Sequence, residues 1–466
     1  MNKFIEAIAN VFRVPDLRKR VFFTLALLAV YRLGAFIPTP GVNAAALQDF
    51  FQQNRGSVFG MLSLFSGGML ERLTIFALGI MPYITASIIL QLLTVVVPTL
   101  EKLSKEGELG RRKITQWTRY LTIALSIMQS FGIAIALQSS DGNFVLNPGI
   151  GFILMTIVTL TTGTAFIMWL GEQISERGLG NGMSLIIFAG IVVGLPSAVY
   201  SVWENVFVTR NWPAVQAIAI LVVMVAVVAF IVLVERAERR VPVQYAKRVV
   251  GRKVLGGQQT HMPLKVNAGG VIPVIFASSM LALPQTLATL PAVKSSEWAS
   301  SVLAAIAYSE PLYIVIFVAA IIFFCFFYVS IIFNPNEAAD NMRKYGGFIP
   351  GIRPGKNTAD YLNKILTRIT VVGGIYLAIL CLIPDIMIAG IKLQHLPLIG
   401  NWIDSNFPRA LLDGLGVQFY FGGTSLLIVV GVAMDFVNQV EAQLIMRHYE
   451  GFTPKAGRVR GRRSMF

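Results

Sequence analysis

The residue pattern nearest to an enzyme motif is the glycine–lysine pair at positions 355 and 356. A phosphate-binding loop needs another glycine five residues before that glycine, and a serine or threonine after the lysine. This chain has Pro350 and Asn357 at those two positions. We therefore predict that the chain has no nucleotide site of its own, is not an enzyme and carries no cofactor.

Cysteine and histidine are placed poorly for metal or redox chemistry. Cys325 and Cys381 both lie within long apolar stretches, and neither belongs to a Cys-x-x-Cys pair or to a Cys/His cluster. The sequence therefore predicts neither a disulfide framework nor a metal site.

Acidic residues are absent from the middles of the apolar stretches. Glu172, Glu235, Asp385 and Asp435 all lie near the ends of such stretches. A proton- or sodium-coupled carrier usually needs buried ionisable side chains as a relay. This counts against an inverted-repeat transporter for a small solute, which stays the main alternative, beside a scaffold or insertase without a pore.

Weakly polar residues instead follow helical spacing within two apolar stretches. One helical face of the second stretch carries Ile80, Ile84, Ser87 and Gln91, and the seventh opens with Asn267 and continues through Ile275 to Ser278 and Ser279. Hydrogen bonds between membrane helices average about 0.6 kcal/mol. A signal-peptide core of about ten apolar residues could supply about 3–6 kcal/mol. Such a seam would be closed at rest and could be opened by a hydrophobic segment.

Ten apolar stretches of about 20 residues, each long enough to cross a bilayer, must position these side chains. A mean hydropathy of +0.67 and 55% hydrophobic residues exclude a soluble globular chain. We predict an all-α polytopic membrane protein with spans near Val21–Ile37, Ile75–Val97, Tyr120–Leu137, Phe152–Leu170, Met183–Val202, Val215–Val234, Gly269–Leu290, Leu312–Phe333, Ile369–Ile388 and Phe419–Val437.

Lysine and arginine are distributed unevenly between the two sides that these spans define. The termini and every second loop carry 32 of them, the other five connections carry 6, and Arg32 lies inside the first span. The positive-inside rule then places both termini in the cytosol, together with the long basic loops 235–268 and 334–368. The net charge of +15 would attract anionic lipids or a polyanion such as ribosomal RNA.

Two shorter segments flank or interrupt the spans. Met1–Arg20 has the pattern of a short interfacial helix. Phe59–Arg72 is apolar but too short to cross a membrane, so it is either an amphipathic surface helix or a small helix folded back into a cavity on the external side. No A-x-A cleavage site follows the first span, so we expect it to be retained as a membrane helix.

Several sequence motifs are specific to one family, and the resemblance to it extends from about Phe22 to Tyr449. The chain resembles the SecY family, the central subunits of the bacterial protein-conducting channel. The matching strings are Phe65–Gly68, Ile75–Gln91, Glu106–Lys113, Trp169–Gly182, Tyr245–Arg248, His261–Ser279, Phe348–Gly355 and Phe421–Leu427.

The resemblance implies two inverted halves of five helices, 21–205 and 206–440, around an hourglass pore, with a basic cytosolic tail at 441–466. It implies a plug helix at about 59–72, which would include Phe65, Ser66, Gly67 and Gly68. It implies a lateral gate with Ser87, Gln91, Asn267 and Ser278 at its polar positions. It implies an apolar pore ring formed by Ile80, Ile84, Met183, Ile187, Ile275 and Ile428, in which Met183 departs from the usual isoleucine; ordinary core packing is the alternative for these six.

The resemblance also implies partners and a location. Arg353 and the pair Arg252 and Lys253 would dock the SecA motor and the ribosome; for Arg353 the alternative is an arginine that braces its own loop. The small subunits SecE and SecG, signal peptides, nascent chains and anionic lipids are the other implied partners. The expected location is the bacterial inner membrane, with cytosolic termini.

Overall fold

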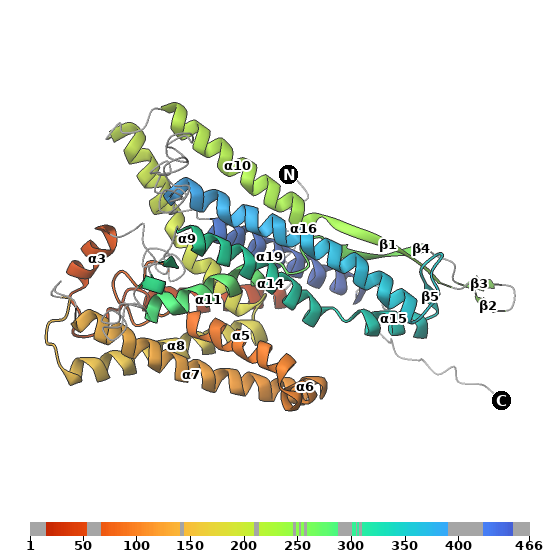
Figure 1. The fold of residues 1–466 in the computed structure, drawn as a ribbon, viewed down its shortest axis with the longest axis horizontal. Coiled ribbons are helices and arrows are strands. Elements are labelled where there is room, and N and C mark those ends of the chain that lie inside the picture. The colour runs from red at the N-terminus through yellow and green to blue at the C-terminus, as the bar shows by residue number, and fades with distance from the viewer. Residues whose placement is uncertain are drawn as a thin grey trace, which may run out of the picture.

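The computed structural model describes residues 15–53, 67–139, 144–208, 214–245, 248–250, 253–255, 259–287, 301–303, 305–306, 310–389 and 423–450. The chain is mostly helical, as predicted. Figure 1 shows the long helices running side by side, with the strands extending beyond one end of the bundle.

Residues before position 209 form one group of helices. They are α2 (Pro15–Gly34), α3 (Ala44–Gln53), α5 (Met81–Val96), α6 (Pro98–Lys105), α7 (Glu108–Gln138), α8 (Ile150–Arg177), α9 (Gly182–Trp203) and the short π-helix η1 (Glu204–Val208). Within this group α7 packs against both α5 and α8.

The rest of the chain adds α10 (Ala214–Arg236), α11 (Ile272–Leu287), α14 (Pro311–Ile332), α15 (Pro335–Lys344), α16 (Lys356–Ala389) and α19 (Gly423–Glu450). Here α14 packs against α11 and α16, and α19 packs against α10 and α16. The two groups meet where α11 contacts α5 and where α19 contacts α9.

A small antiparallel sheet occupies the two basic loops, and the all-α prediction missed it. The strands are β1 (Glu238–Tyr245), β2 (Arg248–Val250), β3 (Lys253–Leu255), β4 (Gln259–Lys265) and β5 (Gly347–Phe348), in the order β4–β1–β5 with β2 and β3 paired separately. Glu238 pairs with Lys265 and Gln244 with Gln259, while Tyr245 pairs with Gly347. Sequence positions about 100 apart are therefore hydrogen-bonded into one platform.

Alternation in β1 explains why this loop forms strands. Val241 and Val243 are buried, whereas Arg240 and Pro242, which precede them, are exposed. Valine favours strands, and a period of two places both side chains on one face. On that face, Val241 packs with Leu264, Ile349 and Leu362 in a separate small core.

Among the described residues, five helices are long and apolar enough to cross a membrane, or six if α5 and α6 count as one span bent by 100°. Shorter apolar stretches lie at Gly182–Pro196 and Ile272–Leu281. The count of ten spans stays a prediction.

Several predicted boundaries differ from the observed helices. Residues 75–80 are turns rather than helix, because Pro82 in the first turn of α5 lacks an N–H group and Gly79 takes a positive φ of 56°. At the other extreme, α7, α16 and α19 run several residues beyond their apolar stretches. Hydropathy marks only the lipid-facing length of a helix, whereas polar residues can continue the same helix into water.

Candidate functional site

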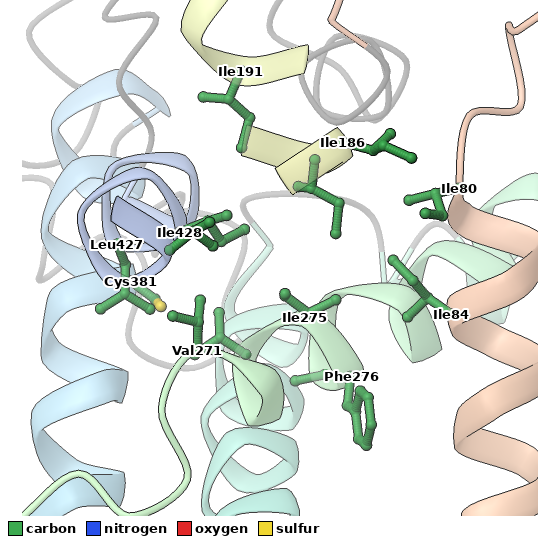
Figure 2. Packing of buried hydrophobic residues seen from close by; sticks show 14 of the residues in the cluster. Ile80, Ile84, Ile186, Ile191, Val271, Ile275, Phe276, Cys381, Leu427 and Ile428 are labelled. Atoms are coloured by element: carbon green, nitrogen blue, oxygen red, sulfur yellow. The ribbon is translucent and has the colours of Figure 1, made fainter. Parts of the chain in front are cut away.

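Apolar side chains from both groups of helices converge at one level of the bundle. Ile80 and Ile84 come from α5, Ile275 from α11 and Ile428 from α19, and all four are buried. Figure 2 shows them pointing toward one another. Ile187 of α9 is buried in the same cluster, and Met183 packs against it partly buried.

Local structure sets the α5 side of this cluster. Because α5 begins at Met81, Ile80 occupies the cap position, and its carbonyl accepts a hydrogen bond from the Ile84 N–H at 3.1 Å. The two isoleucines are therefore one helical turn apart on one face.

Tight packing sets the α9 side. The Asn181 side-chain oxygen accepts a hydrogen bond from the Met183 N–H at 3.1 Å, which caps the start of α9. A Cβ at Gly171 of α8 would collide with the Met183 sulfur, so this glycine gives Met183 its room. Met183 thus packs against the isoleucine cluster although it is not itself an isoleucine.

A cavity of about 430 Å³ lies directly against the cluster. Its apolar floor includes Ile84, Met183, Ile187 and Ile275. The helix ends that surround it are those joined to α6, α15 and the sheet, so the cavity lies on the side of the basic loops.

The cavity has two chemically different walls. Helices α5, α7, α8 and α9 contribute Ser87, Gln91, Thr115, Arg119, Glu172, Ser175, Glu176, Asn181 and Ser184. Helices α11 and α14 contribute Ile272, Phe276 and Tyr328. One half of the molecule therefore supplies the polar wall and the other half supplies a mostly apolar wall.

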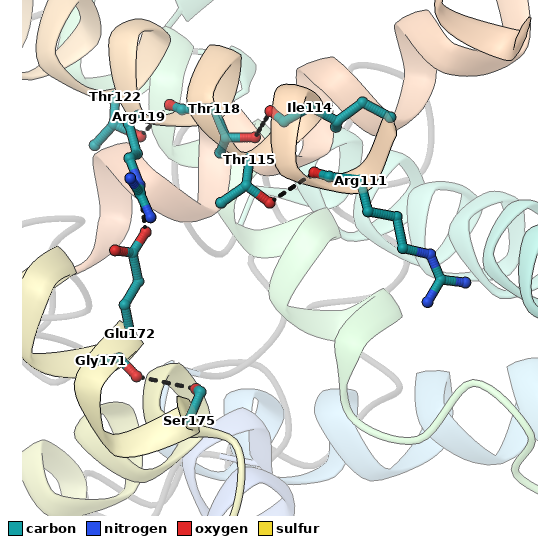
Figure 3. A network of polar contacts seen from close by, with 9 residues as sticks. All are labelled: Arg111, Ile114, Thr115, Thr118, Arg119, Thr122, Gly171, Glu172 and Ser175. Atoms are coloured by element: carbon teal, nitrogen blue, oxygen red, sulfur yellow. Dashed lines mark hydrogen bonds and ion pairs between the residues drawn. The ribbon is translucent and has the colours of Figure 1, made fainter. Parts of the chain in front are cut away.

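An ion pair stands in the polar wall. Arg119 Nε of α7 donates to Glu172 Oε1 of α8 at 2.8 Å, with 41% of the arginine side chain and 17% of the glutamate side chain exposed. Figure 3 shows this pair between the two helices. The hydroxyls nearby, Thr115 and Thr118, donate to carbonyls one turn back on their own helix, so the ion pair is a direct polar tie between α7 and α8.

The sequence alone does not mark Arg119 as a site residue. It lies one residue before the predicted third span, and Glu172 is predicted only to lie near a span end. Two opposite charges at neighbouring ends of consecutive spans were the available signal, but nothing in one sequence shows that both side chains face the same cavity.

The predicted gate residues are divided between two environments. Ser87 and Gln91 line the cavity, and α5 contacts α11. Ser278, however, donates to the Ile275 carbonyl of its own helix at 3.0 Å. Asn267 Nδ2 donates to Glu235 Oε1 at 2.6 Å and to the Gly270 carbonyl at 3.1 Å.

The expected pairing of Asn267 with the α5 face is therefore not what this structure has. Its amide instead ties the start of α11 to the end of α10. The carboxyl group of Glu235, at the end of α10, lies within hydrogen-bonding distance of this amide and so supplies its acceptor.

Only the end of the predicted plug is described. Phe65 and Ser66 lie outside the described residues. Gly67 has a positive φ of 65°, and a Cβ there would lie 2.6 Å from the Gly190 carbonyl oxygen of α9. Met69, two residues on, is buried in the same cluster as the isoleucines. This segment thus packs against the converging apolar side chains.

The predicted docking residues lie on the basic loops. Arg252 is outside the described residues, and Lys253 is the first residue of β3. Arg353 is exposed, between Gly351 and Gly355, which both take positive φ. Thr358 Oγ1 donates to the Arg353 carbonyl at 3.0 Å. The loop is therefore braced through the backbone of Arg353, and its guanidinium makes no ion pair within the described residues.

Metal chemistry finds no support in this part of the molecule. No cluster of three or more His, Cys, Asp or Glu side chains suited to a metal occurs among the residues that the structure describes. Cys325 and Cys381 are both buried, and no disulfide joins them.

Comparison with known sequences gives one consistent result. The sequence model of the SecY family matches residues 74–437. The protein translocase subunit SecY of Escherichia coli strain K12 is 48% identical over 444 residues, which is 95% of each chain. The subunit of the same name from Vibrio cholerae is 48% identical over 447 residues, with 95% of each chain covered.

Solved structures share the fold at lower sequence identity. A structure described as that of a protein-conducting channel has a TM-score of 0.62 and 18% identity, covering 93% of this chain and 94% of that one. Sec61 in a canine ribosome–channel complex has a TM-score of 0.57 and 17% identity, with coverage of 93% and 94%. At these identities the likeness concerns the fold alone.

Proposed function

The chain belongs to the SecY family of protein translocase subunits, and we propose that it passes unfolded preproteins across the bacterial inner membrane through a central pore. It is a multi-pass membrane protein and a channel subunit. We propose further that apolar membrane segments leave the pore sideways into lipid. The exit would lie between two pairs of helices, with α5 and α7 on one side and α11 and α14 on the other. The drive would come from the SecA ATPase or from a translating ribosome, since the chain offers no phosphate-binding loop.

The observation that carries this proposal is the convergence of apolar side chains from both halves of the chain, directly beside the cavity on the side of the basic loops. A constriction of Ile80, Ile84, Met183, Ile187, Ile275 and Ile428 can hold back ions by dewetting, whereas a charged ring would attract them. Apolar side chains also recognise no particular sequence, so chains of any composition can slide past.

The plug completes the proposed resting state. Gly67 approaches α9 at Gly190, between Ile187 and Ile191 along that helix, and Met69 packs into the ring cluster. These contacts support a segment of about 59–72 that covers the ring from the external side. When the segment moves away, only the ring would remain as the seal.

The platform of β1, β4 and β5 supports the proposed docking role. It joins the two basic loops, so Arg353 and the β2–β3 hairpin are carried by connected elements. We propose that this surface binds SecA and the ribosome, that SecE and SecG complete the complex, and that anionic lipids contact the basic rim. Both termini would then be cytosolic.

Cross-linking of a translocation intermediate tests this function. A photo-reactive residue at position 275 should capture an arrested preprotein, because Ile275 lies both in the ring and at the cavity. The same residue at position 222 is the matched control, since Val222 is exposed on the outer face of α10. Equal capture at both positions, or none at 275, would refute a central path.

A further inference from the structure

The cavity against the ring is acidic within a strongly basic protein. Its ionised lining residues are Arg119, Glu172 and Glu176, which leaves a net charge of −1, while the whole chain carries +15. Tyr83 and Tyr328 also line it and are neutral at pH 7. A cation that enters this cavity therefore meets a net negative charge.

The two carboxylates differ in what occupies them. Glu172 holds Arg119 at 2.8 Å and is mostly buried. Glu176, one turn along α8, is exposed toward the cavity and is in no ion pair that the structure shows. The cavity thus offers one open carboxylate and a second that already binds a guanidinium.

The second carboxylate can exchange one cationic partner for another. Because 41% of the Arg119 side chain is exposed, water can solvate the guanidinium when it is released. Glu172 is only 17% exposed, so its carboxylate would be costly to leave without a cation when Arg119 departs. A lysine or arginine from outside can therefore replace Arg119 at Glu172.

The apolar wall of the cavity favours a cation that is followed by apolar residues in the same segment. Ile272, Phe276 and Tyr328 face the carboxylates across the cavity, and Ile84 and Ile275 form its floor. A segment with an apolar run next to basic residues would place the run against the apolar wall and its charge at Glu172. Signal peptides have this pattern, with a basic stretch before an apolar core.

We propose that Glu172, together with Glu176, is a binding site for the lysine or arginine side chains that precede the apolar core of an incoming segment, with Arg119 as the resident competitor. This inference rests on the proposed channel function and deepens it. The site would hold the basic flank on the side of the basic loops while the apolar core moves to the gate.

The test uses the reconstituted channel complex and two preproteins that differ only in three lysines or three glutamines before the apolar core. The readout is the ratio of their initial import rates, because a general loss of activity cancels in that ratio. Glu172→Gln should lower the lysine-to-glutamine ratio by about two- to five-fold, and Arg119→Gln should raise it, since it frees Glu172.

A purely bracing role predicts a different result. If the pair only ties α7 to α8, both variants lose the same contact and the ratio stays at the parental value. Glu108→Gln is the matched control, because it removes a carboxylate that pairs with Arg112 on the exposed face of α7, outside the cavity. The ratio should not change in that control.

A second measurement does not depend on transport by the variants. A carbodiimide should cross-link a lysine of the bound signal segment to Glu172 or Glu176, and Glu172→Gln should reduce the product. An unchanged ratio together with an unchanged cross-link would overturn the inference. If both preproteins fail to cross even in the parent, the proposed channel function itself fails.

Discussion

Arg353 has a braced backbone, and its guanidinium forms no ion pair with the residues that the structure describes. Thr358 holds the loop through the Arg353 carbonyl, so a change of the guanidinium leaves that hydrogen bond in place. We expect Arg353→Glu to abolish channel-stimulated ATP hydrolysis by SecA while the complex still assembles, because a docking arginine cannot be replaced by an acid at a contact with acidic groups. Stimulated ATPase activity measures this.

The control for that substitution is Arg343→Glu on α15, which makes the same charge change at another exposed position of the same loop. It should keep most of the stimulation. Full stimulation by Arg353→Glu, or equal loss in both variants, would contradict a specific docking contact at Arg353.

Of the two glycines in the described part of the plug, Gly67 has less room for a side chain. Gly67→Ala would place a methyl carbon against the Gly190 carbonyl and on a backbone with φ of 65°, so the segment must shift away from α9. We expect more frequent openings of the resting channel in single-channel recordings. Gly68→Ala is the matched control, because it has a similar φ of 78° but open space around its Cβ; equal effects would mean that strain, not contact with α9, is responsible.

At the scale of elements, α5 and α11 form the contact that the proposed gate must break. Ser87→Cys with Phe276→Cys places two thiols on the same cavity from these two helices. With Cys325 and Cys381 replaced by serine, oxidation should join the two new thiols in a disulfide between α5 and α11. This disulfide should block insertion of signal segments, and its reduction should restore insertion. Photo-cross-linking of the signal segment to α5 is the readout, and unimpaired insertion in the oxidised channel would count against a lateral exit here.

Hydropathy predicted most long helices but not their junctions. The spans at Met183–Val202 and Leu312–Phe333 agree with α9 and α14 to within a residue or so, since both are apolar throughout. The start of α5 at Met81 depends on Gly79 and Pro82, and the sheet depends on pairing between β1 and the distant β5. The alternation of β1 is visible in the sequence, but its pairing with the two residues of β5 leaves no such signal.

The residues of the candidate site likewise include some that the sequence could predict and some that it could not. The six predicted ring positions come from the family resemblance, and the structure places all six in or against one apolar cluster; their role as a pore ring stays a prediction. The hydrogen-bond partner of Asn267 could not be predicted, because its acceptor Glu235 lies 32 positions away on another helix. The Arg119–Glu172 pair spans 53 positions, so only the packing of α7 on α8 reveals it.

For the whole molecule, the orientation in the membrane is predicted from the basic residues, of which 32 lie on one side of the spans and 6 on the other. Single cysteines at Arg240 and Arg343, in the two basic loops, should resist an impermeant thiol reagent added outside intact cells and react after permeabilisation. A cysteine at Ser139, at the opposite end of α7, should react without permeabilisation. The reverse pattern would invert the orientation and, with it, the docking surface.

The central claim is that the ring formed by both halves is the seal of a polypeptide pore. Ile84→Ser with Ile275→Ser makes two opposed, cavity-facing ring positions polar. The control is Ile127→Ser with Ile379→Ser, at exposed positions on α7 and α16. The decisive measurement is the single-channel conductance of the reconstituted complex without substrate: the ring variant should leak small ions while the control stays closed, and a ring variant as tight as the parent would contradict the account.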